Sequence, residues 1–566
     1  MLTKRALPDC SGIEPKRRLR QNVVDLFLSN DVSSSRAVDL IQDASAAGAA
    51  HFEDLQRLAG AGALKQNAAR DLLRKVLRRS HWPKLYHAEV RAWDLKTQKA
   101  TKVWLPFLLP HELVHVLAMR SSKQALLCQG GMSVETRAHL ATASVELGSP
   151  ELLALGLWLD GVPCNWDRSQ SLEVVAMSFP GFTGGQANIR LPITVINKMF
   201  CLKDVTFDDI LEVIAWSLRC LVTGTLPSKR HDSKDWLPND AQRRRQGGSP
   251  IGSIRLQGVL AEVRGDWSCF KSIFRLPGWN EKAGCCWRCT VTPEGIRDSS
   301  LQASWRQPEE RLSHWQLVER MLSSGKTLSP LLSAPSFRTS CFLLDWLHCA
   351  DLGITSDFLG NFLWLLLDKM PGNNKTEQCQ RLFLKIKAYY QRHKCDSRLD
   401  ELTLPMLRKE ASVPPKLRAK GAEARALVPF AKEVACELLS DTDLVEGTVK
   451  QCAIHLAACY ECLSAASFSF PALQEHSRRF CLLYVALEAV SQSDTAWRVK
   501  PKLHLFQEMC EASGACPSTC WTYRDEDFGG TLAKLSRRRG GANTPQNTAK
   551  VVLQRFMAKH RVPIIS

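Results

Sequence analysis

The sequence lacks a long, uninterrupted apolar run. The longest one, near Leu359 to Leu367, is too short to cross a bilayer, and the first ten residues lack the apolar core that a signal peptide needs. We therefore expect neither a membrane-spanning nor a secreted protein. The 21 cysteines are accordingly expected to be reduced, most of them as buried thiols and a few as metal ligands.

Acidic residues are scarce relative to basic ones. Lys and Arg number 75 against 57 Asp and Glu, which gives a formal net charge of +18. Such an excess favours a polyanionic partner, and because no lipid-facing helix is expected, we predict DNA rather than a membrane surface. The hydrophobic share of 45% argues against wholesale disorder, and 566 residues predict two or three domains. Whether the chain forms a homo-oligomer is left open.

One stretch, residues 260–289, combines a strand, an acid and a pair of thiols. A short apolar strand ends at Asp266, an amphipathic segment follows, and the stretch closes with Cys286-x-x-Cys289. This thiol spacing is typical of metal sites, and structural zinc takes four ligands that are usually thiolates or imidazoles. Two packed thiols in a Trp-rich core are the alternative. The predicted Zn²⁺ ligands are Cys286 and Cys289, with His314 and His348 as the downstream candidates.

A second acid follows an earlier apolar run. Residues 155–160 form an apolar run that ends at Asp160, and Gly161 follows. An Asp-Gly pair in this place is typical of a hairpin turn, whereas an acid at the end of an apolar run is also typical of the first strand of a sheet. The segments that follow favour the sheet, since three strands, a helix and a fourth strand that leads to an acid fit a mixed sheet with helices on its faces. The predicted elements are strands at 155–160, 172–179, 189–196 and 255–263, with a helix that begins at Thr206.

The order of these motifs resembles the RNase H-like transposases of CACTA type. Beyond the central stretch, the resemblance includes an Asp-x-x-His element at Asp345 and His348 and a Pro-Lys-x-His element at 501–504. Residues 523–529 resemble the family's Phe-Glu-Arg-Phe segment, with Glu526 on the family's acid. Gly529 and Gly530 follow where the family continues a helix, so we expect Glu526 on a turn before a helix at 532–538. Asp525 and Asp527 are rival acids.

This resemblance implies a fold and an activity. The fold is α/β, an RNase H-like mixed sheet with a large all-helical insertion, preceded by a small helical N-terminal domain. Asp160, Asp266 and Glu526 would hold two Mg²⁺ or Mn²⁺ ions, which suit carboxylate oxygens and support phosphodiester chemistry. The implied function is a transposase-like nuclease or strand transferase. A catalytically inactive, domesticated relative that binds nucleic acid in the nucleus is the alternative.

A rival motif predicts a different chemistry. His111-Glu112-Leu113-Val114-His115 matches H-E-x-x-H, in which two histidines on one helix face bind zinc and the glutamate acts as a base. A zinc metalloprotease is therefore a second alternative, with Glu135 as a conceivable third ligand. Because Pro110 precedes the motif, the pair would lie in the first helical turn. Two ordinary histidines at a helix start are the simpler interpretation.

The chain divides by composition into six predicted segments. Pro15 to Arg20 is typical of a nuclear localisation patch, or else of a solvated basic tail. Several basic residues are predicted to contact nucleic acid: Arg243, Arg244, Arg245, Lys500, Lys502, Arg537, Arg538 and Arg539. The segments are a basic disordered tail (1–20), a mostly helical N-terminal domain (21–150), an RNase H-like core with the thiol knuckle (151–354), a helical insertion (355–498), the end of the catalytic core (499–540) and a basic C-terminal tail (541–566).

Overall fold

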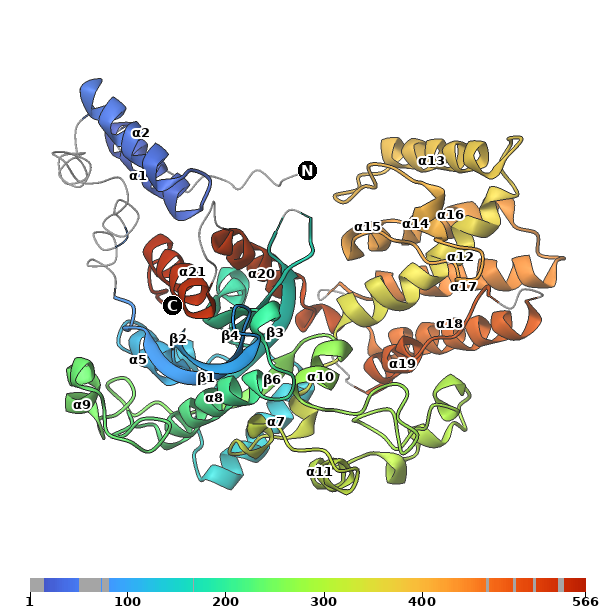
Figure 1. The fold of residues 1–566 in the computed structure, drawn as a ribbon. Helices are drawn as coiled ribbons and strands as arrows, with labels where there is room; N and C mark the ends of the chain where they lie inside the picture. The colour runs from blue at the N-terminus through green and yellow to red at the C-terminus, as the bar shows by residue number, and fades with distance from the viewer. Residues whose placement is uncertain are drawn as a thin grey trace.

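The protein is a mixed α/β molecule in which a sheet with surrounding helices lies beside a helical lobe (Figure 1). The structure is a computed structural model that describes residues 15–49, 73, 81–165, 167–464, 468–491, 495–512, 516–537 and 544–566. Within these residues no helix combines the length and the apolar character that a membrane span requires.

The central sheet contains four strands in the order β5-β4-β3-β6. The first three strands form an antiparallel meander, and β6 pairs with β3 in parallel. A single parallel bridge from Val263 to Phe342 continues the sheet beyond β6. Most of the strand residues are buried, as expected for a sheet that is covered on both faces. The bounds are β3 Leu153–Pro163, β4 Ser171–Ser178, β5 Arg190–Asn197 and β6 Gly258–Arg264.

The register of β3 and β6 brings two acids to one edge of the sheet. Trp158 lies opposite Arg264 in the parallel pair, and Asp160 and Asp266 each follow two residues later. β3 does not end at Asp160 as the sequence predicts. It continues to Pro163, because Gly161, Val162 and Pro163 keep the antiparallel pairing with β4.

Four helices pack against the strands. Helix α8 (Thr206–Thr223) buries Ile210, Leu211 and Ile214 and contacts β6. The other three are α7 (Val134–Leu147) on β6, α20 (Tyr523–Ser536) on β3, and α21 (Pro545–Lys559) on β5 and β2. The segment predicted as a basic C-terminal tail therefore contains a packed helix, since Val552, Leu553, Phe556 and Met557 give α21 a buried face.

The N-terminal part is not a separate helical domain. A hairpin of β1 (Tyr86–Asp94) and β2 (Lys99–Phe107) packs against α8, and the Leu108 N–H donates to the Ile193 carbonyl of β5 at 2.8 Å. Two further helices form a small cluster, α1 (Pro15–Leu28) and α2 (Ser34–Ala46). Because α1 begins at Pro15, residues 15–20 are helical, where the sequence predicts a disordered tail. Of residues 64–77, which belong to the segment predicted as mostly helical, the structure describes Leu73 alone.

The helical lobe follows a π-helix, η10 (Leu347–Thr355), and its helices lie on the right in Figure 1. After the lobe, α19 (Lys502–Ala512) packs against η10 and α18 and precedes α20, which lies on β3. The lobe contains α12 (Ser356–Leu367), α13 (Lys375–Arg392), α14 (Leu404–Leu407), α15 (Gly421–Ala426), α16 (Val428–Leu438), α17 (Leu444–Glu461) and α18 (Phe470–Val490). Shorter helices elsewhere are α5 (Pro110–Ala118), α6 (Lys123–Leu126), α9 (Ala241–Gln246), α10 (Trp267–Ile273) and α11 (His314–Ser323).

Candidate metal centres

Three side chains that are far apart in the sequence meet at the edge of the sheet. Asp160, His348 and Glu526 each offer a ligand atom, and these atoms all lie within 4.8 Å of one another. The Nε2 atom of His348 is 3.9 Å from Asp160 Oδ2 and 3.8 Å from Glu526 Oε1. The structure thus brings together two of the three predicted catalytic acids and adds a histidine.

Glu526 reaches this group because α20 lies close to β3. The helix begins at Tyr523 and continues through Gly529 and Gly530, so the expectation that Glu526 lies on a turn before the helix is wrong. A Cβ atom on Gly529 would lie 2.6 Å from Cη2 of Trp158. The glycine is therefore what allows the helix to approach the strand.

The two rival acids flank Glu526 on α20. Asp525 is completely buried and forms ion pairs with Arg190 and Arg264, so its carboxylate stabilises the packing of α20 on the sheet. Asp527 is exposed and does not belong to the Asp160 group. Among the three neighbouring acids, Glu526 is the one that faces Asp160.

Asp266 lies in the same region but not in the same tight group. Its Oδ1 atom accepts a hydrogen bond from the Cys269 N–H at 2.5 Å and so caps α10. Asp266 and Asp160 line one cavity of about 480 Å³. The Asp266 carboxylate is outside the group of atoms within 4.8 Å, but it is close enough to raise the pKa values of both Asp160 and Glu526.

A fourth acid, Glu173, lines this cavity and is not among the site residues that the sequence predicts. It lies on β4 opposite Gly161, and the residue is only 8% exposed. A Cβ atom on Gly161 would lie 2.8 Å from Glu173 Oε1, so the glycine leaves room for the carboxylate. Burial, together with the charge of Asp266, raises the pKa of Glu173. The available signal was an acid inside the otherwise apolar strand LEVVAMS.

The centre accumulates negative charge in a buried place. Burial and the neighbouring Glu526 raise the pKa of Asp160 well above its ordinary value. Burial and the charges of Asp345, Asp525 and Asp266 raise the pKa of Glu526 to about 7, although its hydrogen bond with Asp160 acts in the opposite direction. A divalent cation would neutralise this charge, and hard carboxylate oxygens suit Mg²⁺ or Mn²⁺.

His348 is held in place by Asp345. Its Nδ1 atom is 2.5 Å from Asp345 Oδ2, and Thr522 donates to the same carboxylate from its backbone N–H and its hydroxyl at 2.9 and 2.7 Å. Burial alone would lower the pKa of His348, but the hydrogen bond and charge of Asp345, with the charge of Asp160, raise it. The Nε2 atom therefore faces Asp160 and Glu526. The prediction that His348 binds a metal together with Cys286 and Cys289 is wrong, because His348 belongs to a different group.

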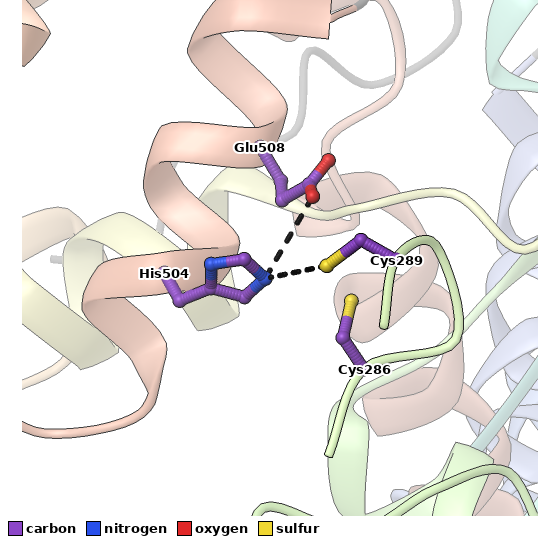
Figure 2. Close-up of side chains that lie close together, drawn as sticks. All are labelled: Cys286, Cys289, His504 and Glu508. Atoms are coloured by element: carbon purple, nitrogen blue, oxygen red, sulfur yellow. Dashed lines mark hydrogen bonds and ion pairs between the residues drawn. The ribbon is translucent and has the colours of Figure 1, made fainter. Parts of the chain in front are cut away.

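The thiol pair meets a different set of ligands. Cys286 and Cys289 face His504 and Glu508, and one potential ligand atom from each of the four residues lies within 4.8 Å of the others. In Figure 2, His504 and Glu508 lie one helical turn apart on α19 and point toward the two sulfur atoms. His504 Nε2 is 3.5 Å from Cys289 Sγ and 3.7 Å from Glu508 Oε1. Two ligands of a tetrahedral zinc ion, with Zn–S near 2.3 Å and Zn–N near 2.0–2.1 Å, would lie roughly 3.5 Å apart.

The charges around this group also suit a metal. All four side chains are buried, and Arg311 donates to both oxygens of Glu508 at 2.6 and 2.8 Å. Burial would raise the pKa of Glu508, but these hydrogen bonds lower it. Burial opposes ionisation of Cys286, but hydrogen bonds with Cys289 and His504 lower the pKa of the Cys286 thiol. The same hydrogen bond between the two thiols raises the pKa of Cys289. A thiol with a lowered pKa loses its proton more readily to become the thiolate that binds a metal.

The predicted ligand set of the thiol knuckle needs a correction. His314 begins α11 and packs its ring against Trp315 and Phe337. His504 was noticed in the sequence only as part of the Pro-Lys-x-His element. The i, i+4 spacing of His504 and Glu508, directly after Pro501, is the signal that would have identified both ligands.

The H-E-x-x-H motif starts α5, but its members have other partners. His111 Nδ1 lies 2.8 Å from Ser217 Oγ, and burial lowers the pKa of His111 to about 3. Glu112 accepts two hydrogen bonds from Arg243, at 2.5 and 2.8 Å, so its carboxylate is not available as a base. Within the described part of the chain, the motif belongs to neither potential metal group. Glu135, its conceivable third ligand, pairs with Arg288 instead.

The predicted nucleic-acid contacts divide into paired and exposed residues. Arg243 is ion-paired, Lys500 binds Asp357 at 2.6 Å, and the Lys502 ammonium donates to the His348 carbonyl at 2.7 Å. Arg244 and Arg245 are exposed on α9. Arg537 is only partly exposed, and Arg538 and Arg539 lie outside the described residues.

Comparison with known proteins gives no family to which the chain could be assigned. No family model matches the sequence. A comparison with curated proteins finds no match either.

Proposed function

We propose that the protein is an RNase H-like, transposase-related enzyme that cleaves or joins DNA strands by two-metal phosphodiester chemistry. The observation that carries this proposal is the meeting of Asp160 and Glu526, which come from the two ends of the chain's α/β part. Asp266, two residues after the neighbouring strand β6, lies in the same region. A cluster of raised carboxyl pKa values in a buried place is a common property of catalytic metal sites.

The sheet supports the RNase H-like assignment. An antiparallel meander, β5-β4-β3, is followed by a parallel strand, β6, on the other side of β3. The bridge at Phe342 adds the position of a fifth strand next to β6. Asp160 lies within β3, two residues after the pair of Trp158 with Arg264, and Asp266 follows the end of β6 by two residues, so both acids lie at the same edge of the sheet.

Asp160, Glu526 and Asp266 would hold the metal ions. Glu526 and His348 approach Asp160 from one side, while Asp266 and Glu173 line the cavity with it. When bound, Mg²⁺ or Mn²⁺ activates a water or a 3′-hydroxyl and stabilises the leaving oxygen. The chain's own contribution is to hold the carboxylates in place, through the capping bond of Asp266 and the packing of α20, and to orient His348 through Asp345.

A structural zinc ion at Cys286, Cys289, His504 and Glu508 belongs to the same proposal. Such an ion would fasten the knuckle to α19, and α19 precedes the helix that carries Glu526. The net charge of +18 and the exposed Arg244 and Arg245 favour DNA as the partner, and the basic run at 15–20 favours the nucleus.

Strand cleavage in Mn²⁺ tests the proposal. We expect wild-type protein to cut a labelled DNA duplex, whereas Asp160→Asn and Glu526→Gln should abolish cutting and leave DNA binding unchanged or slightly stronger. Asp527→Asn is the matched control, because this acid lies on the same helix outside the group. If the control variant loses activity while Glu526→Gln keeps it, the assignment of the third acid is wrong.

The second candidate function is an inactive DNA-binding relative. One observation favours it: Asp266 is outside the tight group and gives one carboxylate oxygen to the cap of α10. A wild-type protein that binds DNA in a salt-dependent manner but cuts nothing in Mn²⁺ would support this alternative over the enzyme.

A further inference from the structure

A cavity of about 810 Å³ lies beside the H-E-x-x-H motif and is lined by none of the proposed catalytic acids. Its walls come from α5, α9, α21 and the segment at 81–87. This volume is typical of a small-molecule site. The residues His111, Glu112 and His115 of the motif therefore form part of the wall of this cavity.

The charges in the cavity favour an anion. Its two carboxylates, Glu112 and Asp240, are both hydrogen-bonded to Arg243, which leaves this trio with one negative charge. Three more cations line the cavity, so the fixed charges sum to about +2: Lys84, Arg120 and Lys550. In the part of the chain that the structure describes, none of these three forms an ion pair, and the buried Nε atom of Arg120 has no hydrogen-bond partner.

The remaining lining is largely apolar and aromatic, and it suits an apolar or aromatic group that is covalently attached to the anion. The buried indole rings of Trp82 and Trp236 lie in the wall together with Val116, Met119 and Met557. His115 Nδ1 accepts the Gly252 N–H at 3.1 Å, so its proton lies on Nε2 and is available for donation. Burial and the nearby Lys550 and Arg243 lower the pKa of His87, as expected in a positive field.

We propose that this cavity binds a nucleotide, with the phosphate at Arg120 and Lys550 and the base against the tryptophan and methionine wall. A phosphate dianion would balance the charge of about +2, and aromatic rings are the surfaces on which bases stack. The nucleotide is either free, with a phosphate dianion, or part of a single strand, in which each internal phosphate carries one negative charge; both present a base and a phosphate to the cavity. The inference does not depend on the catalytic centre, because no residue is shared.

Calorimetric titration of the full chain tests this site. The probes are dAMP, deoxyadenosine, inorganic phosphate and a short single-stranded oligonucleotide. We expect saturable binding of dAMP, and binding at least about tenfold weaker in the Arg120→Gln, Lys550→Gln double variant, since charged hydrogen bonds contribute that much. Both side chains are at least partly exposed, so the fold should tolerate the changes. Arg219→Gln is the control, because Arg219 is exposed on α8 and does not line the cavity.

The probes separate the possible results. Competition between the oligonucleotide and dAMP would identify the ligand as a nucleotide within a strand, and no competition would identify a free nucleotide. Phosphate that binds as tightly as dAMP would overturn the role of the apolar wall. Deoxyadenosine that binds as tightly would overturn the role of the cations. An unchanged affinity of the double variant for dAMP, in a protein that remains folded, would place the ligand elsewhere and refute the proposal.

Discussion

At the scale of single residues, Glu526 links the candidate centre to pH. Its pKa is raised to about 7, above the ordinary value near 4.5, by burial and by neighbouring carboxylates. The folded state therefore binds an extra proton between these two values, and stability from this group is present at low pH and lost as the pH rises through about 7.

We expect the protein without added divalent metal to lose about 1–2 kcal/mol of unfolding free energy between pH 5 and 8 from this group, after a discount for partial exposure of the carboxylate. Glu526→Gln should remove this part of the pH dependence. Denaturant unfolding at several pH values measures it. If the unfolding free energy of wild type and variant depends on pH in the same way, the pKa of the Glu526 carboxyl is not raised in the folded state.

Glu173 permits a second test at the same scale. Because its carboxylate lines the cavity with Asp160 and Asp266, Glu173→Gln should weaken Mn²⁺ binding by several-fold, measured as the metal-dependent rise in melting temperature. Glu212→Gln, an exposed acid on α8, is the control and should change nothing. Equal Mn²⁺ responses of the two variants would show that Glu173 does not contribute to the site.

At the scale of elements, the approach of α20 to β3 decides where Glu526 lies. A methyl group at Gly529 would meet the Trp158 ring at 2.6 Å, whereas nothing lies within 4 Å of a Cβ on Gly530. We expect Gly529→Ala to cost about 1–3 kcal/mol and to impair cleavage, because the helix must move away from the strand. Gly530→Ala should be neutral or stabilising by up to about 1 kcal/mol.

Unfolding curves and cleavage rates of the two alanine variants make this comparison. If the two substitutions have equal effects, the close contact between α20 and β3 is not what holds Glu526 beside Asp160. The pair is informative because the residues are neighbours and the substitutions are identical.

The proposed zinc ion would join the thiol knuckle to α19, and its four candidate ligands make a second prediction about elements. The purified protein should contain about one zinc ion, and the Cys286→Ser, Cys289→Ser double variant should lose it. His504→Gln should weaken zinc binding, whereas His314→Gln should not, since His314 packs against aromatic rings elsewhere. Elemental analysis is the measurement. Full zinc content in the double variant would exclude this site.

The sequence predicted local features better than long-range ones. The apolar strands, the acids that follow them and the thiol spacing were visible because each depends on a few neighbouring residues. His504, Glu508 and Glu173 were missed because their roles depend on contacts across the fold. The two glycines of α20 predict a turn where the structure has a helix. The helical preference of glycine is weak, and the space that Gly529 leaves for Trp158 is a tertiary property.

At the scale of the whole molecule, the charge of +18 predicts salt-dependent DNA binding. The logarithm of the binding constant should fall linearly with the logarithm of salt concentration. Arg244→Gln with Arg245→Gln should reduce that slope by roughly one unit for each lost phosphate contact. Removal of residues 541–566 is not a suitable test, because α21 belongs to the core. An affinity that does not depend on salt would contradict the assignment of DNA as partner.

The central claim is that Asp160, Asp266 and Glu526 jointly hold two divalent ions, and anomalous diffraction from crystals grown with Mn²⁺ tests it most directly. We predict two Mn²⁺ peaks about 4 Å apart, both within ligand distance of Asp160, with Glu526 on one ion and Asp266 on the other. A single peak bound by Asp160, His348 and Glu526 alone, or no peak at Asp160, would contradict the two-metal account.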